Sequence, residues 1–141
     1  MASYNHLNAY KETSIKTASS SKIILMLYDE AIKQMDIAAN NMEKEPKKLD
    51  AINSAILKAQ EVITELMVSL DFEKGGEIAK NLFSLYMFFN QELMNSNVKK
   101  DPGPVKHVRR MVSEIREAWA EIIKNAGPVS GQVEGGLNIA G

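Results

Sequence analysis

The chain has 141 residues, a mass of 15.7 kDa, 45% apolar residues and 25% charged residues, which is enough for one globular domain with a sizeable core. Its 17 basic and 18 acidic side chains give a net charge of -1, which disfavours nucleic-acid binding and attachment to anionic membranes by bulk charge. The absence of cysteine excludes disulfides, thiolate metal sites and cysteine nucleophiles.

The first two predicted helices follow a polar segment, residues 1–19, which we expect to form an N-terminal arm. The first helix begins near Ser20 or Ser21, where a hydroxyl can cap a free N–H group, and ends before Pro46. The second helix covers about 46–70, with the proline in its first turn, where a missing N–H group has no cost. Along both segments apolar residues recur at spacings of three and four, as in amphipathic helices.

Two further helices are predicted over about 77–98 and 104–125. Gly75-Gly76 separates the second helix from the third, and a loop with two prolines and a glycine separates the third from the fourth. Short loops between helices of matched length favour antiparallel neighbours. The sequence therefore predicts an all-α, antiparallel up-down four-helix bundle over residues 20–126, followed by a flexible glycine-rich tail over 127–141.

The third predicted helix carries more apolar surface than one buried stripe requires. Between residues 82 and 89 only Ser84 is neither apolar nor aromatic, and a helix that is apolar all round must be covered by something. Tyr28 and Trp119, in contrast, fit the main stripes and are assigned to the core. The apolar residues that fall off the main stripes are Leu57, Val68, Phe83, Met87, Phe88, Met94, Met111 and Ala118.

Three coverings are compatible with this surplus. The N-terminal arm, with Leu7, Tyr10 and Ile15, can lie over the extra face. A second copy of the chain can cover it in a homodimer, or an amphipathic helix of a partner can be laid along it. The eight methionines favour partner binding slightly, because thioether side chains repack easily around varied surfaces, although methionine is also an ordinary core residue.

The sequence offers little for catalysis or metal binding. It has two histidines, His6 in the arm and His107 beside two arginines, and the Glu-x-x-His pattern of di-iron bundles does not occur. A P-loop and a dinucleotide-binding glycine motif are also absent. Asp29 follows the core residue Tyr28 and is expected at the surface or in a hydrogen bond. We therefore expect no catalytic residues, no metal ligands and no cofactor.

One short segment is basic. Residues 99–110 carry five lysines and arginines against one aspartate, a local charge that could contact phosphates. The segment is brief, has no interleaved aromatic residues and lies at a helix start, where the helix dipole disfavours cations. A solvated surface or a contact to an acidic partner is therefore favoured over nucleic acid.

Four blocks of residues, in this order along the chain, form a recognisable pattern. The first is Tyr10 with Thr17-Ala18-Ser19 and Ile24-Leu25-Met26-Leu27-Tyr28-Asp29, and the second is Ile63-Thr64-Glu65-Leu66 with Leu70-Asp71. The third is Gly75-Gly76-Glu77-Ile78-Ala79 with Asn81-Leu82, Leu85-Tyr86, Leu93 and Asn97, and the fourth is Val112 to Trp119, ending Arg116-Glu117-Ala118-Trp119. With these blocks the chain resembles the FliS family of flagellar export chaperones. Two departures from the family pattern are Ser20, where proline is frequent, and Glu30, where glycine is frequent.

The resemblance implies a function that would use the surplus apolar surface. FliS-like chaperones bind the disordered C-terminal segment of flagellin as amphipathic helices in apolar grooves, prevent premature polymerisation and keep the subunit competent for secretion. The implied protein is a cytoplasmic chaperone and not an enzyme; it is a monomer or a weak dimer, does not insert into membranes, and contacts components of the flagellar export gate. We expect the partner-binding residues to be Leu7, Tyr10, Leu57, Val68, Phe83, Met87 and Met111.

Overall fold

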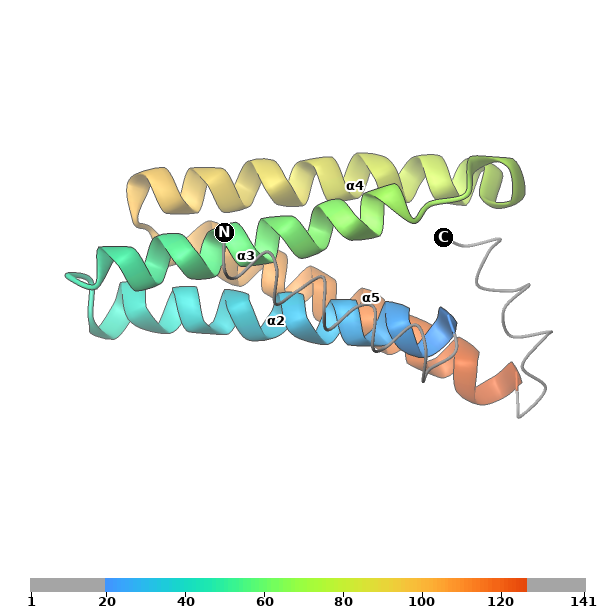
Figure 1. Cartoon of the computed structure of the whole chain (residues 1–141), viewed down its shortest axis with the longest axis horizontal. Coiled ribbons are helices and arrows are strands. Elements are labelled where there is room, and N and C mark those ends of the chain that lie inside the picture. The colour runs from blue at the N-terminus through green and yellow to red at the C-terminus, as the bar shows by residue number, and fades with distance from the viewer. Residues whose placement is uncertain (1–19, 127–141) are drawn as a thin grey trace.

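The computed structural model describes residues 20–126, and these residues form four helices without a strand (Figure 1). With the labels of Figure 1, the helices are α2 (Ser20–Lys44), α3 (Leu49–Val68), α4 (Phe72–Lys99) and α5 (Pro102–Ala126). Each helix runs antiparallel to the one before it, and α5 packs back against α2. The predicted antiparallel four-helix bundle is confirmed, whereas the predicted arm and tail lie outside the described residues.

The start of α3 differs from the prediction. Pro46 was expected in its first turn, but it lies in the turn between α2 and α3, where the Lys48 amide donates to the carbonyl of Glu45 at 3.0 Å. Lys48 itself is not helical, with φ -80° and ψ 63°, so α3 begins at Leu49. The proline thus ends one helix without starting the next.

The starts of α4 and α5 are earlier than expected. The side chain of Asp71 accepts a hydrogen bond from the Lys74 amide at 3.0 Å and caps one helical turn before the glycine pair. Gly76 then breaks the helix with φ 51° and ψ -126°, a conformation that favours glycine, so the predicted break is present as a kink inside α4. α5 starts at Pro102, because a proline needs no N–H partner in a first turn.

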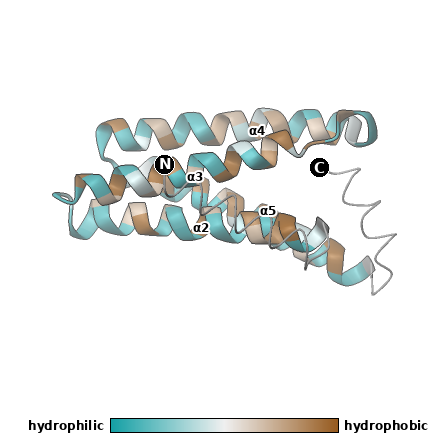
Figure 2. Cartoon of the chain, in the orientation of Figure 1, coloured by the Kyte–Doolittle hydropathy of each residue, from teal (hydrophilic) through white to brown (hydrophobic). Residues whose placement is uncertain are grey.

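The apolar stripes of the four helices meet in one core, and hydrophobic residues recur along every ribbon in Figure 2. Leu49, Ile78 and Ile122 continue the three- and four-residue apolar spacing of their helices, but they are 50%, 51% and 48% exposed. Each lies near an interruption or end of its helix, where no neighbouring helix covers it. The largest fully buried side chains are Tyr28, Tyr86, Phe89, Met35, Ile52, Ile56, Ile63, Leu66 and Leu93.

A buried hydrogen-bonded triad joins three helices within this core. Trp119 of α5 donates from its indole N–H to the Tyr28 hydroxyl of α2 at 2.9 Å, and that hydroxyl is 2.5 Å from the Tyr86 hydroxyl of α4. The three residues are at most 5% exposed. Tyr28 and Trp119 are therefore core residues, as predicted, and their polar atoms are paired with one another as buried polar groups require.

The turn between α4 and α5 is held by a second buried polar group. The Ser96 hydroxyl donates to the carbonyl of Asp101 and accepts from the Val105 amide at 3.2 Å. Lys100 ends α4 in the left-handed conformation, with φ 52°, and its ammonium group donates to Asn53 of α3 at 2.8 Å. These contacts fix where α5 leaves α4 and tie that end of the bundle to α3.

Ion pairs line the outer edge between α2 and α5. Asp29, Asp36 and Glu43 follow one another at intervals of seven residues on α2. Asp29 pairs with Arg116 of α5 at 2.9 Å, Asp36 with Arg109 at 2.9 Å and Glu43 with Lys106 at 2.8 Å. Because these side chains are substantially exposed, each pair contributes only about 0 to 1 kcal/mol to stability. The main effect of the three pairs is to favour one register between the antiparallel helices α2 and α5.

The buried tyrosines predict an alkaline limit to stability. Burial raises the pKa of Tyr28 and of Tyr86 above the ordinary value of 10.0. In the folded state both tyrosines stay neutral at a pH where tyrosines of the unfolded chain ionise. Their contribution to the free energy of unfolding is therefore complete below pH 10 and declines as the pH rises further.

We expect the free energy of unfolding to decline above that pH by roughly 1 kcal/mol per pH unit for each buried tyrosine. Urea unfolding of the wild type and of Tyr86→Phe over a pH series measures the slope, which should be shallower in the variant. Lysine deprotonation affects both proteins alike, so equal slopes would contradict the assignment.

Candidate functional site

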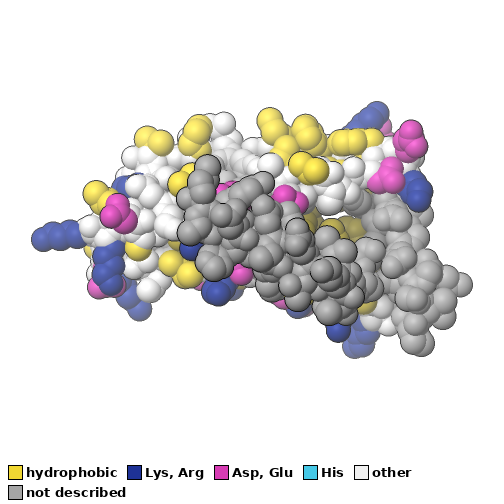
Figure 3. All heavy atoms as spheres, in the orientation of Figure 1, with side chains coloured by type: hydrophobic (Ala, Val, Ile, Leu, Met, Phe, Trp, Pro, Cys, Tyr) yellow, Lys and Arg dark blue, Asp and Glu magenta, His cyan; other side chains and the backbone are white. Residues whose placement is uncertain are grey.

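Large apolar side chains remain exposed on α3 and above all on α4, where the space-filling view shows hydrophobic side chains along the outer edge (Figure 3). The exposed fractions reach 55% for Leu57, 76% for Val68 and 54% for Met87. On α4 the exposed large apolar residues are Phe72, Ile78, Phe83, Met87, Phe88, Met94 and Val98.

Hydrogen bonds at the junction of α3 and α4 show which sides of the two helices meet. Gln60 donates from Nε2 to the main-chain carbonyl of Asn90 at 3.2 Å, and Asn90 donates from Nδ2 to Thr64 Oγ1 at 3.3 Å. Thr64 in turn donates its hydroxyl hydrogen to the carbonyl of Gln60 at 2.9 Å. These three residues form a polar seam between the helices.

The exposed apolar residues lie beside this seam, because residues three, four or seven positions apart share one side of a helix. We name this surface the α3–α4 face. Its members on α3 are Leu57, Glu61, Thr64 and Val68, and on α4 they are Phe83, Met87, Asn90, Met94 and Val98. The face thus has apolar residues toward both ends of the seam and polar residues at its middle.

Four of the seven expected partner-binding residues belong to the α3–α4 face, namely Leu57, Val68, Phe83 and Met87. The ring of Phe83 also meets that of Phe72 edge to face, with centroids 5.9 Å apart, which extends the apolar surface to the start of α4. Met111 lies apart from them on α5, where it is partly buried and packs against the core. Leu7 and Tyr10 lie outside the described residues.

Sequence reasoning assigned no partner-binding role to several members of the face. Met94 was recognised as surplus apolar surface but was not assigned to the partner-binding set. Val98 continues the spacing of Phe83, Met87 and Met94, so extending the periodicity would have found it. Asn90 and Glu61 are polar and gave no such signal, because their place becomes evident only when the register between α3 and α4 is known.

Two polar atoms of the face have no hydrogen-bond partner among the residues that the structure describes. They are Oδ1 of Asn90 and Oε2 of Glu61, and both are shielded from solvent. Buried acceptors are usually paired, and leaving one unpaired costs about 1 to 3 kcal/mol. Both oxygens are therefore enclosed and are not part of the surface that a partner can contact.

The opposite edge of the bundle has a different character. A groove of about 760 Å³ between α2 and α5 is lined mainly by polar and charged side chains, among them Asp36, Asn40, Glu43, Lys106 and Arg109. Two ion pairs cross it, Asp36 with Arg109 and Glu43 with Lys106. Lys106 and Arg109 are two of the five basic residues in the segment 99–110, and both are paired with acids of α2. This favours a solvated surface over a nucleic-acid site.

Within residues 20–126 no group of three or more histidine, aspartate or glutamate side chains is placed to hold a metal ion. None of the helices in that range combines the length and apolar character needed to cross a bilayer. The feature that distinguishes this bundle is thus a broad exposed apolar face with polar groups at its middle.

Such a bundle belongs to the class of small all-α proteins with an exposed apolar face. Residues 3–126 match the family described as Flagellar protein FliS, and the chain belongs to this family. Relatives over most of the chain are flagellar secretion chaperones. The relative from Bacillus subtilis is 30% identical over 89% of this chain and 91% of its own length, and that from Salmonella typhimurium is 34% identical over 82% and 84%. The relative from Vibrio cholerae is 35% identical over 82% and 87%.

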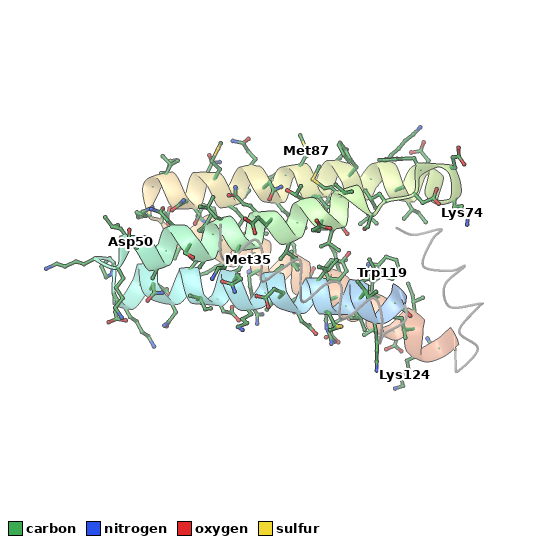
Figure 4. All side chains as sticks on the ribbon, in the orientation of Figure 1. Met35, Asp50, Lys74, Met87, Trp119 and Lys124 are labelled. Carbon is green, nitrogen blue, oxygen red and sulfur yellow. The ribbon has the colours of Figure 1, made fainter. Side chains whose placement is uncertain are left out.

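Two methionines provide a test of which apolar residues are surface residues. Figure 4 shows Met87 on the outer side of α4, where it is 54% exposed, whereas Met35 of α2 is fully buried. We expect Met87→Lys to keep the free energy of unfolding within about 0.5 kcal/mol of the wild type. Met35→Lys should destabilise the bundle by several kcal/mol, because it buries an unpaired charge.

Chemical denaturation followed by circular dichroism measures both variants. Unfolding of Met87→Lys would place Met87 in the core and remove it from the α3–α4 face.

Proposed function

We propose that this chain is a cytoplasmic chaperone that binds the disordered C-terminal segment of flagellin along the α3–α4 face. Membership of the FliS family supports a role in flagellar secretion. The observation that carries the proposal is the double row of exposed apolar residues on two adjacent helices. Covering them with an amphipathic segment would keep that segment from polymerising early and hold it ready for secretion.

The size of the apolar face is consistent with this task. Fully burying a large apolar side chain contributes about 1.5 to 3 kcal/mol, so six half-exposed side chains offer roughly 6 kcal/mol in total. Folding a disordered segment on binding costs about 2 to 5 kcal/mol. The margin is small, and we therefore expect the bound segment to contact further surface beyond this face.

The bundle is suited to present the face in a fixed form. Hydrogen bonds of Gln60, Thr64 and Asn90 join α3 to α4 across the face, and Lys100 joins the two helices again near its end. A surface that is ordered before binding loses less conformational entropy when the partner arrives. The ordering cost then falls on flagellin alone.

Calorimetric titration with a flagellin C-terminal peptide tests the proposal. We expect saturable binding, and we expect Met87→Lys to weaken it by about tenfold, because a lysine ammonium must be desolvated against the apolar segment. Ile37→Lys is the matched control, since Ile37 is 38% exposed on α2 and lies off the α3–α4 face. It should change the affinity by less than about threefold.

Absence of saturable binding to the wild type would refute the flagellin proposal. Light scattering of the free protein should show a monomer or a weak dimer. A tight dimer that Met87→Lys disrupts would show instead that the face binds a second copy of the chain.

We also propose that residues 1–19 act as an arm over part of the binding surface. Leu7 and Tyr10 supply its apolar contacts, and the arm yields when flagellin binds. The glycine-rich residues 127–141 are proposed as a flexible tail. Contact with the export gate would follow binding of flagellin.

Deletion of residues 1–15 tests the arm. We expect the truncated protein to keep its helical circular dichroism and to bind an environment-sensitive hydrophobic dye more strongly, because apolar surface is uncovered. A general loss of helical signal would show that the arm is part of the core.

A further inference from the structure

The first turn of α4 is folded back onto the rest of that helix, and an aromatic contact shows it. Phe72 precedes Phe83 by eleven residues, which corresponds to about 16 Å along the axis of a straight helix. The two rings nevertheless meet edge to face, with centroids 5.9 Å apart. Helical side chains lean toward the N-terminus, so in a straight helix the Phe72 ring would lean away from Phe83. The kink at Gly76 is what brings the two rings together.

The folded turn is held by its own hydrogen bonds. The Gly75 amide donates to the carbonyl of Asp71 at 2.7 Å, and the Lys74 amide donates to the side chain of Asp71 at 3.0 Å. Gly75 is buried, whereas Lys74 is exposed, and Figure 4 shows Lys74 at the end of the molecule. The turn is thus a small ordered unit that carries the ring of Phe72.

This ring is accessible to a partner and adjoins one end of the α3–α4 face. Phe72 is 48% exposed and Phe83 is 38% exposed, so their contact covers each ring only in part. Phe83 belongs to the face, as does Val68, which ends α3 four residues before Phe72. In the antiparallel pair, Val68 follows Thr64 and Phe83 precedes Asn90, so both lie on the same side of the polar seam.

A helix laid along the α3–α4 face would meet the two rings at the end of its path. From Val98 to Phe83 the face follows α4 for fifteen residues, which corresponds to about 22 Å or four helical turns. Aromatic rings offer a large apolar area and pack well against aliphatic or aromatic side chains. An apolar side chain at the end of the bound helix therefore finds a partner in the exposed ring of Phe72.

We propose that Phe72 is a further flagellin-binding residue, and that Gly76 is the positioning residue that holds the Phe72 ring at the end of the α3–α4 face. The ring contacts an aliphatic or aromatic side chain at the end of a flagellin helix that lies along this face. This inference rests on the proposed binding of flagellin to the α3–α4 face.

Calorimetric titration with the flagellin C-terminal peptide tests the role of Phe72. We expect Phe72→Ala to weaken binding by about tenfold, because the peptide loses its contact with the ring. Phe72→Leu keeps a large apolar side chain at the same place, so it should weaken binding by less than about threefold. Equal losses in both variants would contradict an apolar contact at this position.

Phe88→Ala is the matched control. Phe88 is 41% exposed, and its ring also contacts one other ring, that of Phe89, with centroids 6.3 Å apart. It lies two residues from Asn90 and therefore points about 160° away from the polar seam around α4. The control should change the affinity by less than about threefold.

A double-mutant cycle tests whether Gly76 acts through Phe72. Alanine rarely adopts the backbone angles of Gly76, so Gly76→Ala should move the turn and the Phe72 ring with it. We expect Gly76→Ala to weaken peptide binding about as much as Phe72→Ala, and the double variant to bind no more weakly than either single variant. Circular dichroism should show the helical signal of the wild type in all three variants.

The outcomes separate this inference from the flagellin proposal. If the wild type binds the peptide but Phe72→Ala binds equally well, or Phe88→Ala weakens binding as much, Phe72 is not a specific contact and flagellin binding still stands. Additive effects of Phe72→Ala and Gly76→Ala, or a loss of helical signal in Gly76→Ala, would overturn the positioning role of Gly76. If the wild type does not bind the peptide, both proposals are refuted.

Discussion

The buried contact between Tyr28, Tyr86 and Trp119 determines how the bundle presents its surface. It joins α2, α4 and α5 through hydrogen bonds that water does not reach. Because Tyr86 must face this triad, α4 cannot rotate about its axis. Met87, the next residue, then points about 100° away from Tyr86 and lies outside the core. The interior contact thus fixes which residues of α4 are available to a partner.

This constraint explains how one helix can serve two purposes. The inner side of α4 supplies Tyr86, Phe89 and Leu93 to the core, while the side beside α3 carries an exposed apolar row. The row is not a defect of packing, because the polar seam of Gln60, Thr64 and Asn90 ties it to α3 in a defined position. The fold and the candidate site therefore both depend on the orientation of α4 about its own axis.

Much of the fold could be predicted from periodicity, because burial of one stripe per helix decides it. Tyr28 and Trp119 were assigned correctly to the core, and Leu57, Val68, Phe83 and Met87 were recognised as surplus. Their common location needed the structure, since it depends on the register between α3 and α4. The cap at Asp71 was missed because the glycine pair after it suggested a loop. Glu61 and Asn90 were missed because a polar residue on a helix ordinarily indicates only contact with solvent.

The kink at Gly76 has a consequence for how this sequence can vary. A Cβ atom at Gly76 would meet nothing within 4 Å, so there is room for a side chain. The restriction comes from the backbone alone, whose φ of 51° with ψ of -126° suits glycine. Selection at this position therefore acts on chain conformation and not on volume, and strain introduced there would relax by unwinding the short turn that precedes it, while the triad and the helices it joins remain undisturbed.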